Sequence, residues 1–244
     1  MSLYRTFSWK DSNFRIRSDQ FEAVTHEIVE QRTSLEGYIR RHPEFRTALV
    51  PVDLRPGAPN IAWRMARASA LTGIGPMAAV AGTIAQLAAE AGLRAGAQNT
   101  VVENGGDIFL AAQNTVVVGL YSGQAAVAAD LAFRVSPKQM PLALCSSSSR
   151  MGHSTSFGDC DLATVTAPDA SLADAAATLA CNLVKDENDI KAVLDHVGSI
   201  PGVSGVFLAK GGHVGLIGEL PELVRNADDA VELKVTRDSS LRAR

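Results

Sequence analysis

The chain has 244 residues, of which 46% are hydrophobic and 20% are charged, and its formal net charge is -3. This composition is typical of a globular protein with enough apolar material for a sizeable core. The slight acidic excess, with no Lys/Arg run longer than two residues, argues against nucleic-acid binding. The polar N-terminus and the three cysteines, which lack CxxC spacing, predict a cytoplasmic protein with reduced thiols and no membrane span.

Hydrophobic periodicity and turn residues predict the elements of the chain. In the first part of the chain, we expect strands at 4–9 and 14–17, a helix at 19–41, an irregular proline-rich segment at 44–60, a short strand or extended segment at 65–70, and a helix at 76–90. Next we expect strands at 101–103, 108–110, 115–121, 132–135 and 142–145, and a loop at 146–159. The last part should contain a strand at 162–167, helices at 171–184 and 189–197, and a hairpin at 203–209 and 214–217. The first hairpin should turn at 11–13. Ser18 or Asp19 can cap the first helix, and Glu22 would complete a capping box after Asp19. Gly92 should end the second helix.

Hairpin and crossover spacings both occur, which favours an α+β fold over a parallel doubly wound sheet. We expect a single domain over the whole chain, with an N-terminal hairpin and helix at 1–43, a core at 61–220 and a frayed tail at 237–244. An alanine-rich helix twice precedes a strand–Gly–Gly–strand unit, at 76–110 and at 171–217, which suggests an internal duplication. The bare alanine and glycine helix faces also suit a homodimer.

The tetrad Asn104-Gly105-Gly106-Asp107 separates two apolar segments. One interpretation is a tight turn, because Asn and Gly tolerate positive φ and Asp bonds to nearby backbone. The other is a ligand contact, because two residues without Cβ let a ligand lie against the backbone while Asp107 supplies a charge or a hydrogen bond. We expect Asn104, Gly105, Gly106 and Asp107 to contact a cofactor, and Asp107 to be a catalytic residue as well.

A serine-rich loop follows at 146–158, and it contains a histidine. It matches neither a P-loop nor a GxSxG elbow. A linker and a structural histidine are the alternatives, but hydroxyl and backbone N–H groups in such a loop can hold a phosphate. We therefore expect His153 to be catalytic. The serines expected to contact the cofactor are Ser146, Ser147, Ser148, Ser154 and Ser156.

Asp174 and Thr178 lie four residues apart in a predicted helix, so their side chains share one face. Asp174 could instead favour the helix dipole, and Thr178 could bond back to the carbonyl of Asp174. A carboxylate beside a hydroxyl is also the kind of oxygen donor set that Mg²⁺ prefers. We expect Asp174 and Thr178 to be metal ligands.

Four segments, taken in order, resemble an uncharacterised ApbE-like family of prokaryotic proteins. They are GPMAAVAGTIAQLAAEAGL, ENGGDIFL, SSSSRMGHSTSFGDCDLATVTAP and ADAAATLACN, and weaker agreement extends over roughly residues 1 to 220. The wider relatives are the ApbE flavin transferases, which bind FAD and magnesium and move FMN onto a Ser or Thr of a target protein. The resemblance implies that residues 104–107 lie near a flavin nucleotide, FAD or FMN, and that Asp174 and Thr178 bind Mg²⁺. It also implies that the backbone at 73–82 approaches both.

The chain departs from the transferases at three points. Their lysine-glycine step is replaced by Ala79-Val80-Ala81-Gly82, their H-x-x-D-P stretch is absent, and no lipid-anchor signal is present. The resemblance therefore implies the fold and a nucleotide and cation site, without implying the transferase reaction itself. Members of the narrower family are also associated with sulfide assimilation toward homocysteine, which makes Cys145 and Cys160 candidates for handling sulfur, with buried inert thiols as the alternative.

Three functions follow from these observations. The first is Mg²⁺-dependent phosphoryl or FMN-transfer chemistry on a flavin or other nucleotide. The second is sulfur assimilation on the same scaffold, and the third is non-catalytic binding of a flavin or nucleotide. In each case the ligand is a small molecule. We expect the turn at 104–107, the loop at 146–158 and the start of the helix at 173–185 to converge on one cleft. There the helix N-terminus and the serine hydroxyls would hold the anionic part of the ligand.

Overall fold

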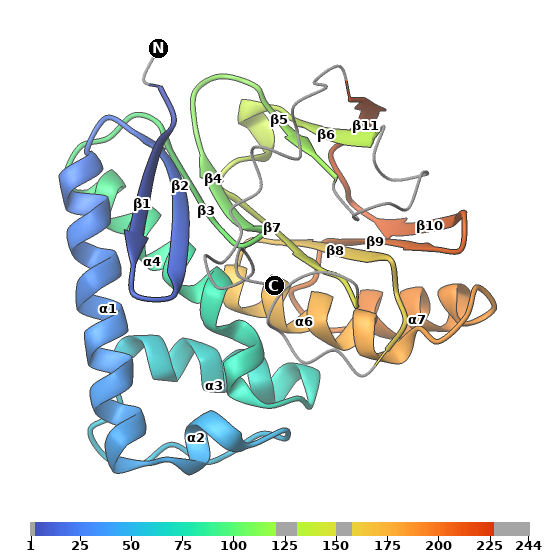
Figure 1. Ribbon diagram of the computed structural model, residues 1–244. Coiled ribbons are helices and arrows are strands. Elements are labelled where there is room, and N and C mark those ends of the chain that lie inside the picture. The colour runs from blue at the N-terminus through green and yellow to red at the C-terminus, as the bar shows by residue number, and fades with distance from the viewer. Residues whose placement is uncertain (1–2, 121–130, 150–157, 227–244) are drawn as a thin grey trace, which may run out of the picture.

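The computed structural model describes residues 3–120, 131–149 and 158–226 (Figure 1). Its helices are α1 (Phe21–Arg41), α2 (Glu44–Thr47), α3 (Asn60–Thr72), η1 (Pro76–Ala79), α4 (Val80–Arg94), η2 (Pro137–Gln139), α6 (Ala170–Leu183) and α7 (Asp189–Gly198). Its strands are β1 (Arg5–Trp9), β2 (Ser12–Ser18), β3 (Thr100–Asn104), β4 (Asp107–Ala111), β5 (Val116–Gly119), β6 (Leu131–Val135), β7 (Leu142–Ser147), β8 (Leu162–Ala167), β9 (Gly205–Lys210), β10 (His213–Gly218) and β11 (Glu222–Arg225).

The strands form two sheets, and every strand pair among the described residues is antiparallel. The larger sheet has the order β1-β2-β3-β4-β7-β8-β9-β10, and the smaller has the order β11-β6-β5. Figure 1 shows the α-helices on one face of the larger sheet and the smaller sheet on the other. Helices and antiparallel sheets together confirm the predicted α+β class.

The two faces of the larger sheet contribute to two separate cores. Val102, Cys145 and Val165 belong to the core beneath the helices. Val101 and Leu144, each adjacent in sequence to one of these residues, belong to the core shared with the smaller sheet. Because successive side chains of a strand point to opposite faces, this division shows on which face each residue lies. It decides below which predicted site residues can meet.

The N-terminal hairpin turns earlier than expected. Trp9 pairs with Ser12, so the turn consists of Lys10 and Asp11, and Lys10 has a positive φ of 54°. The predicted turn at 11–13 is therefore wrong, because Ser12 and Asn13 already belong to the second strand. The alternation that the sequence shows from Phe14 onward simply begins two residues sooner.

The predicted capping box at the first helix is also wrong. Helix α1 follows Gln20, and no side chain caps it. The Asp19 carboxylate instead accepts the backbone N–H groups of Gln98 and Asn99, each at 3.3 Å. A contact 79 residues away in the sequence has replaced the local one.

Two expectations for the second quarter of the chain fail for reasons of packing. The predicted strand at 65–70 is part of α3, in which Ile61, Met65 and Ala68 are buried at helical spacing. Gly92 does not end α4, which continues to Arg94. A Cβ at Gly92 would lie 2.8 Å from Cγ2 of Val24, so this glycine allows α4 to pack against α1.

Within the described ranges, no single helix has both the length and the apolar character needed to cross a membrane. The segments 60–72 and 76–94 meet those criteria as a pair, but they are bent by 109° relative to one another.

Candidate functional site

The tetrad at 104–107 is a two-residue hairpin turn. Asn104 pairs with Asp107, and between them Gly105 and Gly106 have φ values of 66° and 105°. Two consecutive left-handed residues are what a tight hairpin turn of this length requires, and glycine adopts them without steric cost. The turn interpretation is therefore confirmed, and the apolar segment resumes because β4 is a new strand.

Asp107 and Asp174 converge beneath the larger sheet, although they lie 67 positions apart in the sequence. Asp107 begins β4 and is 6% exposed, and Asp174 lies in α6 and is 8% exposed. Burial raises the pKa of Asp107 well above its usual value, and the nearby charge of Asp174 raises it further. Hydrogen bonds from the thiol of Cys145 and from the backbone N–H of Ser146 lower the pKa of Asp107, but by less than burial raises it. Among the described residues, Oδ1 of Asp107 has no hydrogen-bond partner.

The start of α4 holds Asp174 in place. Oδ2 of Asp174 accepts the backbone N–H of Gly82 at 2.8 Å, and the backbone of Ala81 also bonds to this carboxyl. These N–H groups stabilise the charged form, but burial outweighs them and raises the pKa of Asp174 to about 7. The carboxyl group therefore gains or loses its proton near neutral pH when no cation is bound.

Asn104 joins the hairpin turn to the same end of α4. Its side-chain Nδ2 donates to the carbonyl of Ala81 at 3.2 Å. Ala81 thus contacts the turn through its carbonyl and Asp174 through its backbone N–H. The turn and α6 meet, with the first turn of α4 between them. The start of the third segment also reaches Asp107 through the backbone N–H of Ser146, whereas residues 150–157 of that segment lie outside the described ranges.

Thr178 follows Asp174 by one helical turn and is 8% exposed. Other threonines of this chain, such as Thr25 and Thr72, bond back to the carbonyl four residues earlier. Within the described part of the chain, no such bond joins Thr178 to Asp174, so the structural alternative for this hydroxyl is not observed. Its oxygen remains a candidate ligand on the same helix as the carboxylate.

The predicted serines do not all lie on one face. Ser146 bonds through its hydroxyl to that of Thr164, at 2.9 Å. Its neighbour in sequence, Cys145, belongs to the core beneath the helices, so Ser146 lies on the opposite face of the sheet from Asp107. Ser147 pairs with Ala163 and returns to the helix side. Ser148, just beyond the end of β7, is buried.

His153, Ser154 and Ser156 lie outside the described residues. Their predicted roles as a catalytic residue and as cofactor contacts stay predictions.

Ser146→Ala is expected to leave cation binding within about twofold of the wild type, because this hydroxyl lies on the other side of the sheet from the carboxylates. The lost hydrogen bond to Thr164 should lower the free energy of unfolding by about 1 kcal/mol. Calorimetric titration of Mg²⁺ and urea denaturation measure the two effects. A cation affinity that falls tenfold would contradict this assignment of faces.

The N-terminus of α6 already has partners for its N–H groups. Asp169 accepts those of Ser171 and Leu172 at 2.9 and 3.2 Å, and Gln86 accepts that of Ala170 at 2.7 Å. The expectation that this helix end holds the anionic part of a ligand is therefore not supported. The sequence could not reveal this, because Gln86 is supplied by another helix.

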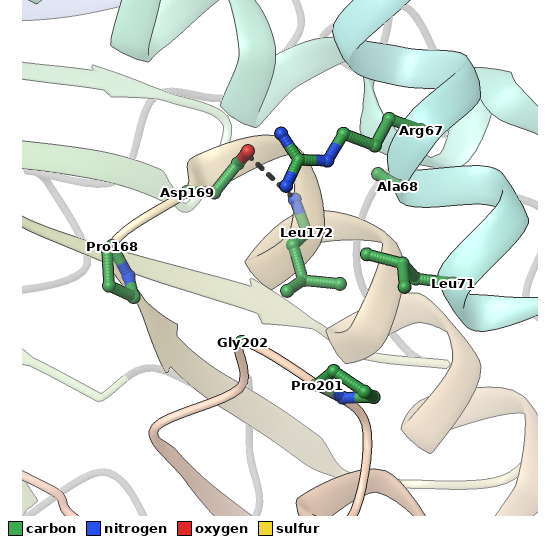
Figure 2. A pocket seen from close by; sticks show the side chains of 8 residues that line it. All are labelled: Arg67, Ala68, Leu71, Pro168, Asp169, Leu172, Pro201 and Gly202. Atoms are coloured by element: carbon green, nitrogen blue, oxygen red, sulfur yellow. Dashed lines mark hydrogen bonds between the residues drawn. The ribbon is translucent and has the colours of Figure 1, made fainter.

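A surface hollow of about 130 Å³ lies beside this helix end (Figure 2). Its lining comes from α3, from the start of α6 and from the segment before β9, and it consists of Arg67, Ala68, Leu71, Pro168, Asp169, Leu172, Pro201 and Gly202. Figure 2 shows Arg67 extending toward Asp169. None of the predicted site residues lines this hollow, so it is distinct from the carboxylate pair.

The cysteines are buried thiols. Cys145 and Cys160 are both 0% exposed. Burial, together with the charges of Asp107 and Asp174, raises the pKa of Cys145 well above its usual value. A hydrogen bond with Cys181, followed by burial, raises the pKa of Cys160. Since the thiolate is the nucleophilic form, these environments favour the inert alternative over sulfur transfer.

The donor set at the carboxylate pair suits a hard cation. No group of three or more His, Cys, Asp or Glu side chains within the described ranges could hold a metal ion. A cation bound here could take oxygens from the carboxylates of Asp107 and Asp174 and from the hydroxyl of Thr178, and water or ligand oxygens would have to complete its shell. That arrangement is common for Mg²⁺, which keeps several waters and binds through one or two carboxylates plus substrate phosphates.

The chain is similar in sequence to proteins of one family. A family model described as "AbpE bacteria" matches residues 6–199. The UPF0280 protein of Methanocaldococcus jannaschii is 37% identical over 224 residues, which cover 88% of this chain and 91% of that protein. The UPF0280 protein of Methanocella arvoryzae is 38% identical over 234 residues, which cover 92% of this chain and 95% of that protein.

Solved structures share the fold at much lower identity. The flavinyl transferase ApbE of Pseudomonas stutzeri, in its apo form, matches with a TM-score of 0.57 and 10% identity, covering 89% of this chain and 94% of the other. The ApbE protein of Thermotoga maritima matches with a TM-score of 0.57 and 11% identity, covering 96% and 100%. These similarities show that the architecture is shared. Because the family model spans most of the chain and both UPF0280 relatives exceed 30% identity, the chain belongs to the ApbE-like family described as "AbpE bacteria".

Proposed function

We propose that this protein binds a flavin nucleotide through Mg²⁺ held by Asp107, Asp174 and Thr178, and that it carries out phosphoryl chemistry of the FMN-transfer type. The observation that carries the proposal is the buried carboxyl group of Asp107. Its Oδ1 lacks a hydrogen-bond partner among the described residues, and a second buried carboxyl group lies nearby. The fold shared with flavin transferases supports the same proposal.

Physical chemistry explains why the carboxylate pair suggests a cation. A buried carboxylate is costly unless it is paired, hydrogen-bonded or bound to a metal. The charged groups that most affect the pKa of Asp107 are Asp174 and Glu103, and both are acids. Two neighbouring acids can avoid repulsion by holding a proton, or they can bind a divalent cation. The available oxygen of Asp107 and the hydroxyl of Thr178 favour the cation.

Each residue then has a definite task. The backbone N–H groups of Gly82 and Ala81 hold the carboxyl group of Asp174 against the start of α4, close to Asp107. Gly105 and Gly106 leave the adjacent turn without side chains, and a ligand can approach its backbone there. When bound, Mg²⁺ would stabilise negative charge on the pyrophosphate of the nucleotide. Asn104 keeps the turn against α4 through its bond to Ala81.

The sulfur-assimilation alternative has no comparable support. It would require an activated thiol, whereas both Cys145 and Cys160 have raised pKa values and no exposed surface. A non-catalytic flavin binder would use the same site as an enzyme, and a product assay distinguishes the two.

The test is calorimetric titration of FAD into the purified protein with and without Mg²⁺, followed by mass spectrometry of the mixture. We expect binding that requires Mg²⁺ and, with water as the acceptor of the FMN group, cleavage of the pyrophosphate of FAD to FMN and AMP. Binding without any product would leave a flavin binder and remove the enzyme. No binding under either condition would contradict the proposal.

A further inference from the structure

Helices α4 and α6 exchange two hydrogen bonds in opposite directions. The N–H of Gly82 on α4 bonds to the side chain of Asp174 on α6, at 2.8 Å. The N–H of Ala170 on α6 bonds to the side chain of Gln86 on α4, at 2.7 Å. Within each helix the two positions are four residues apart, so the bonds span one turn of each. Together they fix both the rotation and the axial position of α6 relative to α4.

Gln86 is itself held by a charged pair. Its Nε2 donates to Oε1 of Glu90 at 2.9 Å. Glu90 accepts two hydrogen bonds from Arg64 of α3, both at 2.8 Å, and each of these two side chains is 26% exposed. Two-point contacts of this kind restrict orientation as well as distance. A chain of bonds thus runs from Arg64 through Glu90 and Gln86 to the first N–H of α6.

The contact between α4 and α6 leaves little room for adjustment. A Cβ at Gly82 would lie 2.4 Å from the carbonyl oxygen of Ala170, so the two backbones already touch. The hydroxyl of Thr83 also bonds to that of Ser171, at 2.8 Å. A change in the bond at Ala170 is therefore transmitted along α6 rather than absorbed by loose side chains.

We propose that Gln86 is a positioning residue for the cation site and that it helps to select Mg²⁺ over Ca²⁺. By fixing the start of α6, Gln86 sets the distance between Asp174 on that helix and Asp107 on β4. Mg²⁺ requires near-octahedral oxygen ligands at about 2.0–2.1 Å, whereas Ca²⁺ accepts about 2.3–2.6 Å and irregular geometry. A rigid pair of carboxylates favours the smaller ion. This inference rests on the proposed function, because it assumes that the pair binds a cation.

The test compares Mg²⁺ and Ca²⁺ affinities, measured by calorimetry without nucleotide. Gln86→Met keeps the length of the side chain but removes both hydrogen bonds. We expect Mg²⁺ affinity to fall about tenfold, as is typical when a residue that orients a metal ligand is lost, and Ca²⁺ affinity to change less. The Mg²⁺/Ca²⁺ affinity ratio should therefore fall. Loss of stability alone would not change this ratio.

Two further variants sharpen the test. In the double variant Gln86→Glu with Glu90→Gln, the carboxylate at position 86 can accept the N–H of Ala170, and the amide at position 90 can donate to that carboxylate. Both hydrogen bonds can therefore re-form, and the Mg²⁺/Ca²⁺ affinity ratio should recover. Thr166→Val removes a hydroxyl that bonds to the carbonyl of Glu219 at 3.1 Å, away from α4, and should lower the Tm without changing the ratio. If Gln86→Met does not fold, Glu90→Gln alone should lower the ratio by a smaller factor.

The outcomes separate the two proposals. A wild-type protein that binds neither cation would overturn the proposed function and this inference together. A wild-type protein that binds Mg²⁺, with an unchanged ratio in the folded Gln86 or Glu90 variant, would overturn only the positioning role.

Discussion

Asp174→Asn is expected to weaken Mg²⁺ binding about 100-fold or more, which corresponds to ~2.7 kcal/mol, and to abolish Mg²⁺-dependent binding of FAD. Asparagine keeps an oxygen that can accept the N–H of Gly82, so the contact between α4 and α6 is preserved. The charge is lost, and one oxygen instead of two remains to accept the N–H groups of Gly82 and Ala81. Calorimetric titration of Mg²⁺, with Ser146→Ala as a control on the opposite face of the sheet, measures this effect.

The same substitution should change how stability depends on pH. Without a cation, the folded protein keeps a proton on Asp174 up to a pKa of about 7, whereas the unfolded chain releases it near pH 4. The folded state therefore binds more protons between these two values, and the free energy of unfolding falls as pH rises from about 4 to about 7. The proton on Asp174 can account for a fall of at most about 4 kcal/mol in the free energy of unfolding between pH 4 and pH 7.

Urea denaturation at pH 5 and pH 8, without divalent cations, measures this dependence. The wild type should be less stable at pH 8 than Asp174→Asn, and Mg²⁺ should stabilise the wild type more at pH 8 than at pH 5. An Asp174→Asn variant with unchanged Mg²⁺ affinity and an unchanged pH profile would show that this carboxyl group is a structural helix cap.

Gly82→Ala is expected to lower the free energy of unfolding by about 3 kcal/mol or more and to reduce Mg²⁺ affinity as well. The new Cβ would lie 2.4 Å from the carbonyl oxygen of Ala170 and 2.9 Å from Cβ of Asp174. Alanine gains up to about 1 kcal/mol over glycine in a helix, but an overpacked backbone contact costs more than that. α6 must therefore move away from α4 and take Asp174 with it.

Gly37→Ala is the matched control for that variant. Gly37 lies within α1, and the nearest atom to its added Cβ is a side-chain nitrogen of Arg40 at 3.7 Å. This change should stabilise the protein by about 0.5–1 kcal/mol through helix propensity alone. Chemical denaturation of both variants should give shifts of opposite sign. A Gly82→Ala variant that is as stable as the wild type, or more stable, would contradict a tight contact between α4 and α6 at this position.

Sequence periodicity predicted the elements best where one helix or strand buries a continuous apolar face. Helix α6 and strand β8 were located within one residue at either end. The strand predicted at 65–70 failed because six residues are too few to distinguish a helical from an extended apolar pattern, and the buried spacing emerges only over the whole of α3. The capping box at Asp19 failed because that carboxylate bonds to Gln98 and Asn99, which no local pattern reveals.

The candidate site was predictable only in part. Asp107, Asp174 and Thr178 could be named from a tight turn, from helical spacing and from a resemblance in motif order. The placement of the Ser146 hydroxyl on the opposite face of the sheet from Asp107 could not be predicted, because it depends on the register of β7 with its neighbours. The contribution of Gln86 was missed, since it arises where α4 crosses α6. Gly82, in contrast, lies in the segment 73–82, whose backbone the resemblance had placed near the site. The turn at 104–107 needs its two glycines for backbone geometry whether or not a ligand binds there.

The most direct test of the carboxylate pair as a cation site is a crystal structure of the protein soaked in Mn²⁺, which prefers the same oxygen ligands as Mg²⁺. The measurement is the anomalous difference density of manganese. We predict a peak within about 2.0–2.3 Å of a carboxylate oxygen of both Asp107 and Asp174, beside the hydroxyl of Thr178. Manganese density only at other positions, with none between Asp107 and Asp174, would contradict the assignment of this carboxylate pair as a cation site.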